Sequence, residues 1–109
     1  MITIEDFRKL DLRVARIAAV DDFAEARRPS YRLTLDVGPY GTRRSSAAIR
    51  PFYRSDELVG RLVVCVLNLP PRRIAGFASE VLVLGAIRPS GDVRLLRPDP
   101  GAEVGDPIA

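Results

Sequence analysis

The chain has 109 residues, of which 17 are basic and 14 acidic, so its net charge of +3 permits an anionic partner without requiring one. Histidine is absent and Cys65 is the only cysteine, which excludes a zinc site of Cys and His ligands, an intramolecular disulfide and a histidine general base. We see no nucleophile–base pair or phosphate-binding loop, and therefore expect one domain over residues 1–109 that is not an enzyme and holds no metal or other cofactor.

The longest apolar segment covers residues 62–67, far fewer than the ~20 residues that a membrane-spanning helix needs. The N-terminus carries acidic residues where a signal peptide has a basic start, so we expect a soluble, cytoplasmic protein without membrane insertion. All basic residues except Lys9 are arginine, whose planar fork suits phosphate groups. A genome of high G+C content would produce the same bias, so the bias alone does not indicate a ligand.

The N-terminal residues carry the pattern of a short helix. Thr3 and Asp6 have the spacing of a capping box, which predicts a helix over residues 3–10. Its apolar face would consist of Ile4, Phe7 and Leu10. So short a helix is marginal by itself, and we expect it to pack on its own barrel or on a second subunit.

Most of the remaining chain has the pattern of strands. Apolar and extended segments predict strands over residues 12–20, 31–37, 42–49, 62–68 and 81–84, followed by an extended piece over 93–96. A shift of phase near 15–17 suggests a bulge, and 21–29 and 70–78 are expected to lack regular structure. A helical turn is expected over 55–60, between the third and fourth strands. This order is typical of an all-β, five-stranded OB-fold, a Greek-key barrel.

A family resemblance extends over nearly the whole chain. It is carried by NLPPRRIAGFASEVLVLG (68–85), FRKLDLRV (7–14) and shorter matches at 23–27, 45–47, 53, 58–60 and 91–98. These segments resemble the CsaA family, small bacterial and archaeal proteins built on a tRNA-binding domain. The resemblance implies an OB-fold barrel whose N-terminal helix and C-terminal extension are used in a homodimer. It also implies a non-catalytic module that recognises tRNA by shape or, alternatively, an export-related chaperone that binds unfolded or presecretory peptides.

The expected binding groove lies in the middle of the chain. Seven basic and only two acidic residues occur between positions 43 and 73, and two prolines stiffen the loop beside Arg72 and Arg73. The resemblance places Ser46, Asn68, Arg73, Ser79 and Glu80 in the groove, and the residue types add Ser45, Arg72 and Phe77 to the candidates.

Several of these candidates have a structural alternative, and for Arg72 and Arg73 it is a solvated loop with an ordinary cluster of charges. Asn68 is as suited to bonding loop backbone as to binding a ligand. Ser45 and Ser46 fit a closely packed strand edge, and Phe77 fits the core as well as a stacking surface. Glu80 is expected either to be exposed at the rim or to pair with an arginine such as Arg73.

One position departs from the family pattern. Ala48 stands where relatives carry glutamine, so an amide contact to the ligand would be lost. Arg50 could replace it in charge but not in geometry. Cys65 lies within an apolar strand and is expected to be a small core residue.

Overall fold

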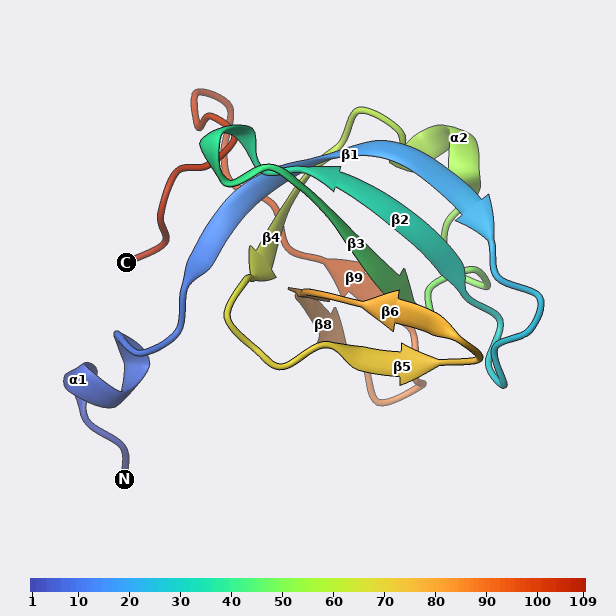
Figure 1. Cartoon of the computed structure of the whole chain (residues 1–109), viewed down its shortest axis with the longest axis horizontal. Helices are drawn as coiled ribbons and strands as arrows, with labels where there is room; N and C mark the ends of the chain where they lie inside the picture. Colours follow the sequence, from blue (N-terminus) through green and yellow to red (C-terminus); the bar gives the residue numbers. More distant parts are fainter.

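Five antiparallel strands form the main sheet of the computed structural model, which describes residues 1–109 (Figure 1). In chain order they are β1 (Leu12–Asp22), β2 (Tyr31–Asp36), β3 (Thr42–Ala47), β4 (Leu62–Val66) and β7 (Leu82–Val83). In space the order is β3-β2-β1-β4-β7. The long strand β1 pairs with β4 over its first half and with β2 over its second half, so it belongs to both sides of the sheet.

A bulge in β1 lets the sheet curve. The pairing of β1 with β2 changes register between Ile17 and Ala19, slightly beyond the position suggested by the sequence pattern. A bulge bends its strand and increases the local twist, and this turns a flat sheet toward a barrel. Figure 1 shows β1 curving over the length of the molecule.

The core fills the concave side of this curved sheet. Leu33, Leu35 and Val37 alternate along β2 and beyond its end, and all three are fully buried. They pack with Val63 of β4 and with Leu58 from the helical turn α2 (Ser55–Leu58). The predicted helical turn between the third and fourth strands therefore places an apolar side chain in the core. A 3₁₀ turn, η1 (Gly38–Tyr40), links β2 to β3.

Residues 72–79 form a β-hairpin, which corrects the expectation that 70–78 lack regular structure. Strands β5 (Arg72–Ile74) and β6 (Phe77–Ser79) pair around a two-residue turn. Both turn residues have positive φ, 48° at Ala75 and 81° at Gly76, and such turns match the twist of paired strands. The two prolines precede β5, so they remove no hydrogen-bond donor from its ladder.

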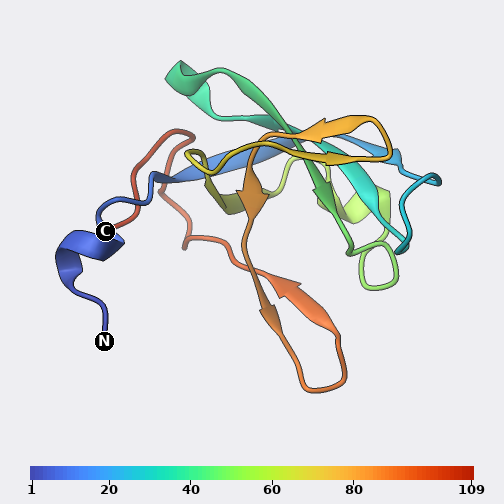
Figure 2. The same cartoon turned by 60° about the horizontal axis from the view of Figure 1, so that its bottom comes forward.

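A second hairpin, β8 (Gly85–Ile87) and β9 (Val93–Leu95), projects from the barrel (Figure 2). Gly85 permits its close pairing, because a Cβ there would lie 2.8 Å from a methyl carbon of Val93. The hydroxyl of Tyr53 accepts a hydrogen bond from the Leu95 N–H at 3.0 Å, which fixes the end of β9 to the barrel.

The N-terminal helix α1 (Ile4–Phe7) is shorter than predicted, although the predicted capping box is present. The Arg8 N–H still donates to the Ile4 carbonyl four residues back, but the N–H groups of Lys9 and Leu10 donate three residues back, which tightens and ends the helix. Hydrogen bonds from Thr3 and Lys9 lower the pKa of the Asp6 carboxyl below its usual range. Figure 1 shows α1 beyond the barrel, and Ile4 is 55% exposed. No helix in the structure is both long enough and apolar enough to cross a membrane.

Candidate nucleic-acid interface

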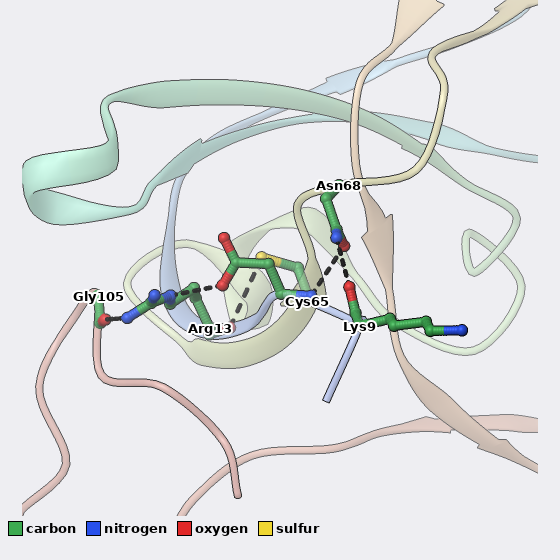
Figure 3. Close-up of polar contacts among 6 residues, drawn as sticks. Lys9, Arg13, Cys65, Asn68 and Gly105 are labelled. Atoms are coloured by element: carbon green, nitrogen blue, oxygen red, sulfur yellow. Dashed lines mark hydrogen bonds and ion pairs between the residues drawn. The ribbon is translucent and has the colours of Figure 1, made fainter. Parts of the chain in front are cut away.

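Asn68 uses both ends of its side-chain amide to hold the segment that precedes β1. Its Oδ1 accepts a hydrogen bond from the Asp11 N–H at 2.8 Å, and its Nδ2 donates to the Lys9 carbonyl at 2.7 Å (Figure 3). The side chain therefore bonds backbone, although in the segment before β1 rather than in the loop that follows β4. A ligand-binding role would require this amide to release both partners.

Beside this anchor, Arg13 joins the segment before β1 and the C-terminal tail to the barrel, and Cys65 bonds β4 to β1. Arg13 donates to Asp11 Oδ1 at 2.7 Å and to the Gly105 carbonyl at 3.2 Å, while the Cys65 thiol donates to the Arg13 carbonyl at 3.6 Å (Figure 3). The C-terminal tail also bonds β1 through the N–H groups of Gly105 and Ile108. The region before β1, β1 itself and the tail thus form one connected structure.

Burial raises the pKa of the Cys65 thiol to about 11, partly opposed by the positive charge of Arg43. The unfolded chain loses this proton near pH 9, so the thiol's contribution to stability is present below pH 9 and is lost between about pH 9 and pH 11. We expect Cys65→Ala to lose less stability than wild type between pH 8 and pH 10.5 in urea denaturation. An equal loss in both proteins would contradict the shifted pKa.

Ser45, Ser79 and Glu80 close the barrel. Ser45 Oγ donates to the Val81 carbonyl at 3.0 Å, and Ser79 Oγ accepts from the Ser46 N–H at 3.0 Å. Glu80 Oε1 accepts from the Arg44 N–H at 2.9 Å, and the Glu80 N–H donates to the Arg44 carbonyl at 2.8 Å. These bonds join β3 to the end of β6 and to the segment between β6 and β7. Ser45 and Ser79 are buried, and Glu80 bonds backbone instead of pairing with Arg73.

Phe77 lies in the protein interior, at 8% exposure. The ring of Phe23 packs edge-on at 5.3 Å between centroids, and the Arg44 guanidinium lies 4.6 Å from the Phe77 ring centre. Both neighbours occupy space that a stacking base would need. The geometry therefore favours the core alternative for this residue.

Arg72, Arg73 and Ser46 line a groove of about 780 Å³, which we call the basic groove. Its full lining is Glu25, Ala26, Arg27, Arg28, Ser30, Ser46, Ala48, Arg72, Arg73, Ile74 and Ala75. None of its four arginines forms an ion pair, and the only side-chain hydrogen bond among them runs from Arg73 to the Gly76 carbonyl. The groove thus presents four exposed guanidinium groups whose donors are largely free.

Arg27 and Arg28 were not among the residues predicted to bind a ligand. They end the loop between β1 and β2, and only the fold brings that loop beside the β5–β6 hairpin. The sequence contained a signal for them, because two consecutive arginines lie next to proline in both segments. The order is Arg27-Arg28-Pro29 in one and Pro70-Pro71-Arg72-Arg73 in the other. Proline next to a basic pair limits the backbone freedom that binding would otherwise cost.

Two further hollows meet the basic groove at Ser46 and Arg72. A proline pocket of about 440 Å³ is lined by Ser46, Leu69, Pro70, Pro71, Arg72, Ser79, Glu80, Val81 and Leu82. An apolar groove of about 630 Å³ runs along the β8–β9 hairpin, and Phe52, Val83, Ile87 and Val93 are among its lining residues. Ser46 and Arg72 are therefore the residues that a ligand entering any of the three would meet.

Ala48 lines both the basic and the apolar groove. Arg50 lines neither, and its guanidinium lies 3.3 Å from the Asp22 carboxylate. Arg50 therefore does not stand in for the missing glutamine side chain. No group of three His, Cys, Asp or Glu side chains is placed to hold a metal ion.

Comparison with known proteins identifies the family. Residues 12–107 match the family model described as "Putative tRNA binding domain". The chain belongs to this family of tRNA-binding domains. It is 47% identical over 110 aligned residues to a methionine–tRNA ligase of Thiobacillus denitrificans, and 44% identical to one of Sorangium cellulosum. These alignments cover 94% to 95% of the chain but only 14% to 16% of the ligases.

Solved structures of similar length agree over the whole chain. The CsaA chaperone of Picrophilus torridus is 51% identical with a TM-score of 0.94, and both chains are covered completely. Chaperone CsaA of Bacillus anthracis is 45% identical with the same TM-score, over 100% of this chain and 99% of that one. The predicted CsaA family and its OB-fold barrel are thereby confirmed. The binding roles of the individual residues stay predictions.

Proposed function

We propose that this protein binds tRNA as a non-catalytic module, with the phosphate backbone lying in the basic groove. The observation that carries the proposal is the set of four arginines without an acidic partner in one concave surface. Guanidinium groups bind phosphate oxygens in pairs of hydrogen bonds, and phosphate contacts provide most of the sequence-independent affinity for nucleic acid. The family match and the similarity to methionine–tRNA ligases support tRNA as the polyanion. Binding of tRNA would place the protein in the cytoplasm.

Salt dependence tests this proposal directly. Each phosphate contact releases condensed counterions, so four contacts predict that affinity falls roughly as the third to fourth power of the salt concentration. Fluorescence anisotropy with labelled tRNA between 50 and 300 mM KCl measures the exponent. An affinity that does not change with salt, or no binding at low salt, would rule out the phosphate contacts.

We also propose that the protein is a homodimer formed through its N-terminal helix and C-terminal extension. Ile2 and Ile4 are 76% and 55% exposed beside the barrel, and Leu96 of the extension is 44% exposed. A second copy would cover these side chains and bring two basic grooves into one tRNA-binding surface.

Ile4→Asp should convert the dimer into monomers, because it introduces a charge where an apolar side chain would be covered. Light scattering at micromolar concentration gives the mass. Val59→Asp is the matched control, since Val59 is 53% exposed on the barrel itself. A monomeric wild-type protein would refute the proposed dimer.

Binding of unfolded or presecretory peptides remains a second candidate. The apolar groove favours it, because apolar side chains from β3, β7, β8 and β9 line a single concave surface. The CsaA structures are described as chaperones, and this description supports the same reading. Peptide binding in the apolar groove would depend little on Arg27 and Arg73, which line the basic groove and not the apolar groove.

A further inference from the structure

The proline pocket is placed to receive a group attached to an anion in the basic groove. The two hollows share Ser46 and Arg72, and the side chain of Arg72 has no hydrogen-bond or ion-pair partner. A phosphate bound by Arg72 would therefore bring its nucleoside to the mouth of the proline pocket. The volume of about 440 Å³ lies within the range of small-molecule sites.

The walls of this pocket suit a flat ring. Pro70 and Pro71 form part of the lining, with Leu69 and Leu82, which are 39% and 43% exposed. Proline rings fix the backbone of this segment, so the pocket loses little conformational freedom when it is filled. Stacking the face of a base on this solvent-exposed apolar surface removes the surface from water, which favours binding.

Glu80 provides the polar group of the pocket lining that is relevant to base preference. Its Oε1 bonds the Arg44 N–H, whereas Oε2 has no partner in the protein and is not among the buried unpaired atoms. An ionised carboxylate only accepts hydrogen bonds, so it favours a base that presents N–H donors. Among the RNA bases, guanine presents two adjacent donors, N1–H and the N2 amino group.

We propose that the proline pocket binds one unstacked guanine of the RNA, with Glu80 accepting from its N1–H and N2 amino group and Arg72 binding its phosphate. This inference rests on the proposed tRNA binding and adds a base preference to it. It also gives Glu80 two roles, since one carboxylate oxygen closes the barrel while the other contacts the ligand.

Mononucleotides test the pocket without relying on the shape of tRNA. Titrations followed by amide NMR should show guanosine monophosphate shifting the Ser46, Val81 and Leu82 signals. It should bind at least about fivefold more tightly than uridine monophosphate, because paired hydrogen bonds to one base edge discriminate by about 1–3 kcal/mol. Inosine monophosphate, which lacks the N2 amino group, should lie between them.

Glu80→Gln tests the base contact separately from the structural bond. The glutamine carbonyl oxygen still accepts from the Arg44 N–H, while an NH₂ donor replaces the second carboxylate oxygen. We expect the variant to remain folded, to lose the preference for guanosine over uridine monophosphate and to bind tRNA a few fold more weakly, because one base contact is lost. Unshifted pocket signals, or an unchanged preference in the variant, would overturn the guanine pocket while tRNA binding persists. If the wild-type protein does not bind tRNA, the proposed function itself is refuted.

Discussion

Replacing both Arg28 and Arg72 by alanine should lower the affinity for tRNA about 10- to 100-fold at 100 mM salt. Both side chains line the basic groove without an acidic partner, and a hydrogen bond to a charged group contributes about 1.5–3 kcal/mol before screening. The salt exponent should fall by about 2, one for each phosphate contact removed. Fluorescence anisotropy across a salt series gives both quantities.

The control for this variant is Arg88→Ala with Arg97→Ala. These two arginines are exposed, form no ion pair and line none of the three hollows, yet their removal changes the net charge by the same amount. Equal losses in the two double variants would mean that net charge, and not the basic groove, determines affinity. Arg27→Ala with Arg73→Ala separates the two candidate functions, because these two arginines line the basic groove and not the apolar groove. Binding of an unfolded polypeptide in the apolar groove should survive their loss.

Asn68→Ala should destabilise the attachment of the N-terminal segment, by about 1–3 kcal/mol for two hydrogen bonds. Hydrogen exchange at the Asp11 amide should accelerate, since this N–H loses its acceptor and the segment before β1 is freed. Urea denaturation and exchange monitored by NMR measure the two effects. If the dimer forms through this segment, its dissociation constant should rise as well.

Two comparisons tell the anchoring role from a ligand contact. Asn68→Asp keeps an acceptor for the Asp11 N–H but loses the donor to the Lys9 carbonyl, so it should retain part of the exchange protection. The affinity of the alanine variant for tRNA, measured at concentrations where the protein is dimeric, should change less than twofold. A large loss of affinity with unchanged exchange would show that Asn68 contacts the ligand.

The predictable parts of this protein are those specified by neighbours in the chain. Thr3 and Asp6 are three residues apart, so the capping box could be recognised before the fold was known. The alternation in residues 31–37 predicted both β2 and the side chains it buries, because a strand places successive side chains on opposite faces. The hairpin at 72–79 was missed because its turn requires positive φ at Ala75, which alanine rarely adopts.

The sequence by itself indicated the main strands in chain order, the buried face of β2 and the resemblance to the family. Only the tertiary structure decided which polar side chains remain available to a ligand. Asn68 lies 57 residues from Asp11 in the chain, and Ser45 lies 36 residues from Val81, so their hydrogen bonds exist only once the barrel closes. The same closure brings Arg28 beside Arg72. The physical reason is that a polar side chain offers the same donors and acceptors to the protein backbone and to a ligand. Its surroundings in the fold determine which of the two forms the hydrogen bonds.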